Sequence, residues 1–161
     1  MQKKVQIISD GSLDLSQELT KEKDIEVVPF YVSFDSETYQ KEMVEVGVRE
    51  FYQEMVDHPT VFPKTSMPSV HDYYEVFEKH AKEKMPVICI CITRKFSGSL
   101  QSATTAKDMI LEEYPDAQIT VIDSTVNTVL QGLYVLEACR LRDMGLEYQQ
   151  IVDALLPIRE T

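Results

Sequence analysis

Four short runs of apolar residues stand out along the chain, each bounded by polar or turn-forming residues. The runs are rich in valine and isoleucine and alternate little between apolar and polar positions, which is typical of parallel strands covered on both faces. The predicted strands are Val5–Ser9, Glu26–Phe34, Val87–Ile92 and Ile119–Ile122.

Apolar residues repeat at helical spacing between and after these runs. Such stripes begin at Val48, Val70, Ala103 and Ile151, and the stretch Val129–Leu141 is apolar on most sides, which predicts a well-buried helix. Strands that alternate with helices indicate a parallel sheet with right-handed crossovers. We therefore expect an α/β fold with a doubly wound, Rossmann-like parallel sheet and helices on both faces.

The residues that stop helices and strands agree with this reading. Pro86 precedes the third strand, Pro115 follows the third helical stripe, and Gly145 follows the long apolar helix as a C′ cap. The polar stretch from Asp35 to Val46 is expected to be a loop or a short edge strand.

Composition narrows the class of partner. With 161 residues, 43% of them hydrophobic, the chain suffices for one domain with a real core. A formal net charge of −11 argues against nucleic acid and anionic membrane surfaces as partners, because both are polyanions. No apolar run approaches the length that spans a bilayer, so no integral membrane association is expected.

Three cysteines, Cys89, Cys91 and Cys139, have no metal or disulfide spacing. Buried, reduced thiols are the expected state, and they indicate a cytoplasmic protein. The N-terminal segment MQKKVQIISDGS is interpreted as the entry to a first strand rather than a signal peptide.

Candidate binding residues follow the predicted strands, where parallel sheets gather their ligands. The loops are rich in hydroxyl groups, and Pro68 suggests that the segment from Lys64 to Ser69 opens a helix. Such residues are often simply helix N-caps, but free N–H groups at a helix start also favour an anion. The candidate ligand-binding residues are Thr65, Ser66, Ser97, Gly98 and Ser99, and the candidate cleft-wall residues are Asp10, Ser12, Asp123 and Ser124.

Catalytic and cofactor motifs are not found in the sequence. Neither a P-loop nor a G-x-G-x-x-G fingerprint occurs, and no G-x-S-x-G elbow occurs. His58, His71 and His80 have no ligand or triad spacing, so surface or core roles are expected for them. The pattern favours binding over turnover, with no catalytic residue, metal or cofactor.

Taken in order, these loops resemble the DegV family. The Thr-Ser-Gln-Pro-Ser signature of that family has its counterpart at Thr65–Ser69, and the Leu-Ser-Gly-Thr-Tyr-Gln-Ser-Ala signature at Phe96–Ala103. The other matching segments are Ser9–Leu15, Val27–Val32, Glu50–Tyr52, and Asp123–Thr125 with Gly132 downstream.

This chain departs from the family pattern at four places. Gly11 replaces a serine, Met67 replaces glutamine, Leu100 replaces an aromatic residue, and Tyr39–Glu42 replaces a Tyr-x-Asp-Gly turn. The first three changes leave the hydroxyl groups of the candidate anion site intact.

The resemblance implies a two-domain protein that buries a long-chain fatty acid and is not an enzyme. It implies that Thr65 and Ser97, at helix N-termini, hold the carboxylate, and that some relatives act as acyl carriers for a separate fatty-acid kinase subunit. Residues 1–161 would form the N-terminal α/β domain, the C-terminal lipid-binding domain being absent from this chain. We then expect the Thr65 and Ser97 hydroxyls to face one cleft, and an apolar face to be exposed where the second domain docks.

Physical reasoning is compatible with a lipid carrier, because each buried methylene contributes about 0.8 kcal/mol. Two alternatives remain open at this point. Asp10 and Asp123 follow two strands of the sheet and would suit Mg²⁺, which would make the protein a metal-dependent phosphoryl-transfer or hydrolytic enzyme. A plain interaction domain with capped helices and no ligand is the third reading.

Overall fold

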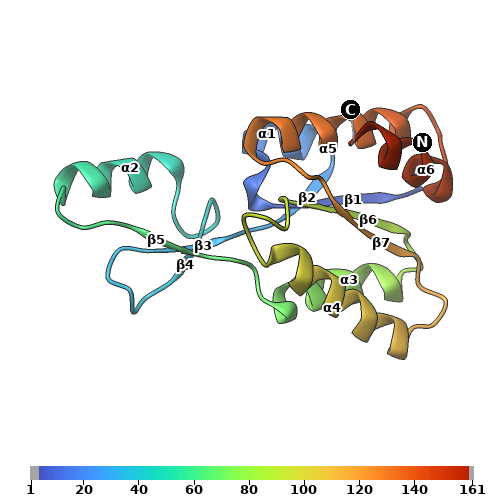
Figure 1. Cartoon of the computed structure of the whole chain (residues 1–161), viewed down its shortest axis with the longest axis horizontal. Coiled ribbons are helices and arrows are strands. Elements are labelled where there is room, and N and C mark those ends of the chain that lie inside the picture. Colours follow the sequence, from blue (N-terminus) through green and yellow to red (C-terminus); the bar gives the residue numbers. More distant parts are fainter. Residues whose placement is uncertain (1–3, 160–161) are drawn as a thin grey trace.

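The computed structural model describes residues 4–159 and shows a body with an arm that projects from it (Figure 1). The body contains a four-stranded parallel sheet with strand order β2-β1-β6-β7. Its strands are β1 (Gln6–Asp10), β2 (Ile25–Val28), β6 (Val87–Cys91) and β7 (Ile119–Asp123). The predicted α/β fold with a doubly wound parallel sheet is confirmed.

Helices cover both faces of this sheet (Figure 1). One face carries α1 (Gln17–Glu22), α5 (Thr128–Asp143) and α6 (Tyr148–Ile158). The other face carries α3 (Val70–Lys82) and α4 (Ser99–Glu113). Of these helices only α1 lacked a predicted counterpart, because six residues are too few to show a periodic stripe.

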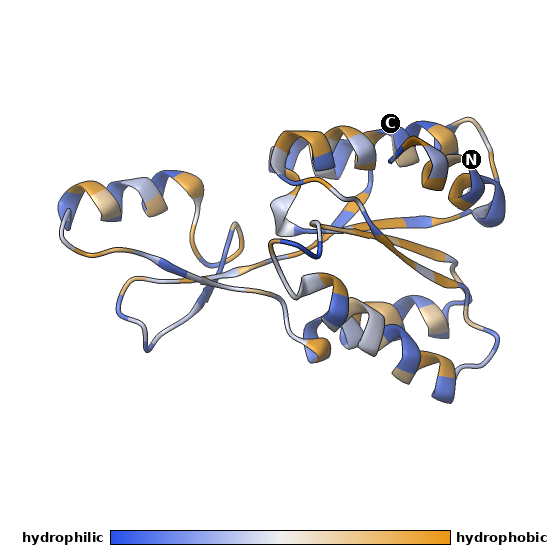
Figure 2. Ribbon diagram, viewed as in Figure 1, coloured by the Kyte–Doolittle hydropathy of each residue, from blue (hydrophilic) through white to orange (hydrophobic). Residues whose placement is uncertain are grey.

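The core lies in two layers, one on each face of the sheet. Ile7 and Ile90 belong to the cluster beneath α5 and α6, whereas Ile8 and Cys89 belong to the cluster beneath α3 and α4. All residues of β1 and β6 are buried, which explains why these strands are apolar without alternation. Figure 2 shows this hydrophobic colouring along the central strands.

The arm interrupts the chain between β2 and α3. It consists of β3 (Tyr31–Ser33), β4 (Gln40–Lys41), α2 (Val48–Asp57) and β5 (Lys64–Ser66), and its strands form an antiparallel sheet in the order β4-β3-β5. The single strand predicted from Glu26 to Phe34 is wrong. It breaks at Pro29, which has no N–H to donate to a sheet, so that β2 stays in the body and β3 enters the arm.

Two local predictions are confirmed. The polar stretch from Asp35 to Val46 is a loop that contains the short edge strand β4. Gly145 lies just beyond α5 with φ of 92°, and its N–H donates to Arg142 O while the N–H of Leu146 donates to Leu141 O. This is the Schellman arrangement that ends a helix at glycine.

The arm has few links to the body. The Tyr31 hydroxyl on β3 donates to both carboxylate oxygens of Asp72 in the first turn of α3, at 2.9 and 3.0 Å. Helix α2 buries none of its residues, although the ring of Phe51 contacts that of Phe34, with centroids 5.4 Å apart. Across residues 4–159, no helix has both the length and the apolar character that crossing a membrane requires.

Candidate functional site

The carboxyl ends of the parallel strands all lie at the edge of the body that faces the arm (Figure 1). From this edge β1 leads into a 3-10 turn at Gly11–Leu13, β6 leads into α4, and β7 leads into α5. The hydroxyl-rich loops singled out in the sequence therefore meet at one edge of the body, apart from Thr65 and Ser66, which lie in the arm.

Asp10 is the centre of a buried polar network at this edge. Its side chain has no exposure to solvent. Oδ1 accepts hydrogen bonds from Gln131 Nε2 at 2.8 Å and from Ser12 N at 3.3 Å. Oδ2 accepts from Ile92 N at 2.9 Å and from Ser99 Oγ at 2.9 Å. Asp10 thus ties together the loops after β1 and β6 and the first turns of α4 and α5.

The hydrogen bonds of Asp10 determine whether its carboxylate has lone pairs left for a metal ion. A carboxylate has about four lone-pair sites, and four donors occupy those of Asp10. Asp123 is a separate centre, whose Oδ1 accepts from Thr125 N at 2.8 Å and whose Oδ2 lies 3.9 Å from Arg94 Nε. Among residues 4–159, no group of three or more His, Cys, Asp or Glu side chains is placed to hold a metal ion.

Ser99 faces inward rather than towards solvent. Its Oγ lies 2.5 Å from the hydroxyl of Tyr73 on α3 in addition to its bond to Asp10. The Tyr73 hydroxyl also lies 3.7 Å from Cys91 Sγ. Burial raises the pKa of Asp10 above its ordinary value, despite the four hydrogen bonds that favour the charged form. Burial likewise raises the pKa of Tyr73 well above its ordinary value.

Ser97 and Gly98 form the start of α4. The Ser97 Oγ accepts the N–H of Ser99 at 3.1 Å, and the same hydroxyl keeps its own proton to donate. Gly98 is the N-cap residue and supplies no side-chain cap. This helix start therefore combines a hydroxyl donor with the positive end of a 15-residue helix.

Thr65 and Ser66 lie in the arm, in strand β5, and both are exposed. Thr65 pairs with Val32 of β3, so the expectation that Thr65 sits at a helix N-terminus is wrong. The helix begins later because Ser69 is the N-cap of α3 and forms a capping box with Asp72. Pro68 accordingly stands before the cap rather than at the first helical position.

Met67 joins the two segments. A Cβ added to Gly98 would lie 2.7 Å from Met67 Sδ and 3.1 Å from Met67 Cε, so the methionine side chain rests on the backbone of Gly98. Gly98 has φ of −80° and ψ of 6°, a conformation that other residues adopt, so the close approach of Met67 is what favours glycine here. The segment with Thr65 and the segment with Ser97 are thus adjacent.

The remaining cleft-wall candidates stabilise their own loops. Ser12 contributes its N–H to Asp10. Ser124 is buried, and its Oγ donates to Val126 O at 3.0 Å. The histidines lie apart from this edge: His58 and His71 are exposed, whereas His80 is buried and its Nε2 lies 3.1 Å from Glu26 Oε1.

Sequence reasoning did not single out Gln131, which is fully buried in α5 and donates to both Ser9 Oγ and Asp10 Oδ1. Tyr73 belongs to the helical stripe that begins at Val70, and that stripe predicted only a place in the core for it. The signal for Gln131 was present in the sequence, because it is a polar residue in a stretch that was predicted to be buried.

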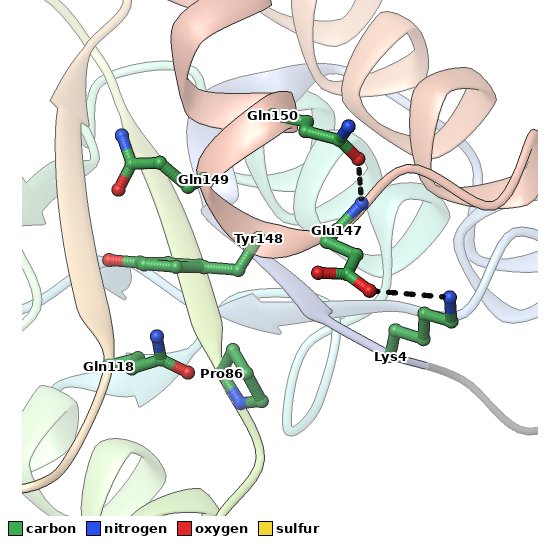
Figure 3. Close-up of a pocket in the computed structure, with 7 residues that line it drawn as sticks. All are labelled: Lys4, Pro86, Gln118, Glu147, Tyr148, Gln149 and Gln150. Carbon is green, nitrogen blue, oxygen red and sulfur yellow. Dashed lines mark hydrogen bonds and ion pairs between the residues drawn. The ribbon is translucent and has the colours of Figure 1, made fainter.

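Two pockets differ in character. A groove of about 710 Å³ begins at Gly11 and runs between α1 and the arm, and its lining includes Leu13, Leu15, Val27 and Val44. A smaller pocket of about 470 Å³ lies at the amino ends of the strands, where Lys4 pairs with Glu147 and the Tyr148 ring lies between Gln149 on one side and Gln118 and Pro86 on the other (Figure 3). Only the groove reaches the edge that carries the hydroxyl loops.

The family model described as "Uncharacterised protein, DegV family" matches residues 4–161. The chain belongs to the DegV family. A DegV domain-containing protein of Clostridium acetobutylicum is 33% identical over 153 residues, which cover 95% of this chain and 53% of that protein.

Solved structures of DegV-like proteins show the same fold. A stearic acid-binding protein from Eubacterium ventriosum is 46% identical with a TM-score of 0.89, covering 94% of this chain and 52% of that one. A DegV family protein from Thermus thermophilus, described by its fatty acid binding, is 28% identical with a TM-score of 0.81, covering 98% and 54%. The chain thus spans about half the length of the relatives it matches.

Proposed function

We propose that this DegV chain binds a long-chain fatty acid, with the carboxylate held by the hydroxyls of Thr65 and Ser97. The observation that carries the proposal is the contact of Met67 with Gly98, which makes the two hydroxyl-bearing segments neighbours at the start of α4. The fatty-acid binding of relatives that share this fold supports the choice of ligand.

The electrostatics of this edge favour an anion. The start of α4 presents the positive end of the helix dipole and no side-chain cap. Lys64 precedes Thr65, and Arg94 and Lys95 precede Ser97, so each segment brings exposed positive charge into a chain whose net charge is −11. Ser66, Gly98 and Ser99 complete the proposed site through the backbone on either side of the two hydroxyls.

The groove beside Gly11 is large and apolar enough to take part of an acyl chain. Burial of each methylene contributes about 0.8 kcal/mol, so a long chain contributes on the order of 10 kcal/mol before the costs of association. The head-group site then has to fix the carboxylate and offset its loss of hydration.

We further propose that these residues are the N-terminal half of a two-domain protein, in line with relatives about twice as long. Val129, Leu130 and Leu133 in the first turns of α5 are each more than half exposed, at the edge that carries the proposed site. A second domain that covers these side chains would also close the site over the acyl chain.

Lipid extraction and native mass spectrometry test the proposed ligand. We expect the purified protein to carry a fatty acid, and Thr65→Ala and Ser97→Ala each to reduce its occupancy at least fivefold. Thr60→Ala, which removes an exposed threonine hydroxyl elsewhere in the arm, is the matched control and should retain the lipid. Protein without lipid that also fails to bind added stearate would contradict the proposal.

We further propose that the full-length protein is an acyl carrier in the cytoplasm. In this role it presents the bound fatty acid to a separate kinase subunit. Cys89, Cys91 and Cys139 are all free and buried, which suits a reducing compartment. We expect an ATP-dependent partner to co-purify with this protein from the soluble cell fraction. That partner should form acyl phosphate only when this protein is present.

A further inference from the structure

The carboxyl group of Asp10 lies directly beneath the start of α4. The Ser99 hydroxyl that bonds to Asp10 belongs to the residue whose N–H is bound by Ser97, so one residue separates the buried carboxyl from the proposed head-group site. No ion pair to Asp10 is formed within residues 4–159. Two negative charges would therefore share one helix start when a carboxylate binds.

The groups that face Asp10 can accept either of its protonation states. When Asp10 is ionised, Tyr73 donates to Ser99 and Ser99 donates to Asp10. When Asp10 is protonated, the direction reverses: Asp10 donates to Ser99, Ser99 to Tyr73, and Tyr73 to the Cys91 sulfur. Each hydroxyl is both a donor and an acceptor, so the reversal requires rotation of hydrogens alone.

Among residues 4–159, the titratable groups packed around Asp10 supply no compensating positive charge. Tyr73 comes from α3, and Cys89 and Cys91 come from β6; all are neutral in their protonated forms. The other elements that touch Asp10 contribute the Ser12 N–H, the Ser99 hydroxyl and the Gln131 amide. In the part of the chain that the structure describes, the groups that bond to Asp10 supply only backbone, hydroxyl and amide dipoles, whereas Arg94 and Lys95, in the loop after β6, are exposed to solvent.

We propose that binding of a carboxylate at the start of α4 is coupled to the uptake of one proton from solvent by Asp10. The inference rests on the proposed function. In the coupled step the ligand enters as an anion, Asp10 takes a proton on Oδ2, and the Asp10–Ser99–Tyr73–Cys91 chain reverses its hydrogen bonds. The net charge at the helix start then stays at one negative charge rather than two.

The pKa of Asp10, which burial already raises, must rise further when the ligand's charge is added. Linkage then fixes the sign of the pH dependence: affinity increases as pH falls through the interval between the pKa of Asp10 in the free and in the bound protein. The increase levels off below the lower of these two values, where Asp10 is protonated in both states.

Calorimetric titration with dodecanoate, in buffers of different ionisation enthalpy at one pH, measures the protons taken up per ligand bound. We expect up to one proton in the wild-type protein and none in Asp10→Asn. The matched control is Asp116→Asn, because Asp116 is an exposed carboxylate in the loop before β7, at the opposite edge of the sheet. That variant should take up protons as the wild type does.

The ¹³C resonance of the Asp10 carboxyl group in wild-type protein provides a readout that needs no variant. We expect its titration midpoint to rise by at least one pH unit when dodecanoate is bound. Dodecanoate binding without proton uptake and with an unchanged midpoint would overturn the coupling but leave the proposed function in place. No binding at millimolar dodecanoate would overturn both.

Discussion

Gly132 lies where α5 crosses the loop that follows β1. A Cβ at this position would lie 2.4 Å from Leu13 O and 2.9 Å from Leu15 Cδ2, and the first of these atoms is backbone that cannot rotate away. The better helix propensity of alanine offsets about 1 kcal/mol of the resulting strain. We expect Gly132→Ala to lower the free energy of unfolding by about 2 kcal/mol in urea denaturation.

Gly47 provides the control for this substitution. It has φ of −75°, and a Cβ there would meet only Glu50 Oε2 at 3.9 Å. Gly47 is the N-cap of α2, where glycine is favoured over alanine, so Gly47→Ala should lower the free energy of unfolding by about 0.5–1 kcal/mol, less than Gly132→Ala. Equal destabilisation in the two variants would mean that loss of glycine itself, rather than the contact with Leu13, is responsible.

Glu26 is a partly buried carboxylate in the edge strand β2. Its carboxylate accepts from Lys79 Nζ at 2.8 Å and lies 3.1 Å from His80 Nε2. Burial tends to raise the pKa of Glu26, but the hydrogen bonds from His80 and Lys79 outweigh it, so the pKa lies below its ordinary value. A lowered carboxyl pKa in the folded state adds stability above the unfolded pKa, near 4.5, and this stability is lost as pH falls through the folded value.

We therefore expect Glu26→Gln to lower the free energy of unfolding by about 1–2 kcal/mol at pH 7, and by progressively less below pH 4.5. Urea denaturation across this pH range measures the effect. Glu75→Gln removes the same charge from the exposed pair with His71 and should cost less than about 0.5 kcal/mol. A pH-independent loss in Glu26→Gln would point to packing rather than charge.

At the scale of elements, the sequence predicted most helices and strands because their apolar residues follow a clear period. It did not predict the separation of β2 from β3, although the break lies at Pro29, where a sheet hydrogen bond cannot form. The stripe at Val48 did predict α2, and the short edge strand β4 lies in the stretch where a loop or edge strand was expected. The sequence did not indicate that these elements form a separate arm, because strands of two or three residues are too short to show a hydrophobic period.

Tyr31 connects the arm to the body through its hydroxyl bonds to Asp72. Tyr31→Phe keeps the ring and removes these bonds, and we expect local opening of the arm to become about 1 kcal/mol easier. Hydrogen exchange at the backbone amides of β3 and β5 should then be roughly fivefold faster, with exchange in β1 and β6 unchanged. Tyr39→Phe, at an exposed tyrosine elsewhere in the arm, should leave these rates as they are.

At the scale of the whole molecule, part of the candidate site was predictable. Hydroxyl-rich loops after parallel strands, together with the family resemblance, pointed to Thr65 and Ser97. The arrangement in space was not predictable, because it depends on the arm carrying Thr65 in a strand and on Met67 packing against Gly98, contacts between residues about 30 positions apart. Asp10 was singled out as a candidate cleft-wall residue, and its hydrogen bonds join the loops that meet at this edge.

The exposed side chains of α5 lead to a test of the two-domain proposal. We expect this chain to bind an apolar-surface dye several-fold more than a longer form that includes the residues after Thr161, and to bind fatty acid more weakly. Leu130→Ser combined with Leu133→Ser should reduce dye binding by this chain without lowering its thermal midpoint, since both side chains are exposed. Equal dye binding and equal fatty-acid affinity in the short and long forms would contradict the proposal.

The arm also affects how the chain reaches its fold. Pairing of β1 with β6 joins Ser9 to Ile90, so the central sheet closes a loop of about 80 residues, whereas pairing of β3 with β5 joins Tyr31 to Ser66 across only about 35. A hairpin-like arm that forms first removes those residues from the longer loop. The entropic cost of closing the loop between β1 and β6 then falls by about 0.5 kcal/mol. An insertion that contributes little to the core thus makes it easier for β1 to pair with β6 during folding.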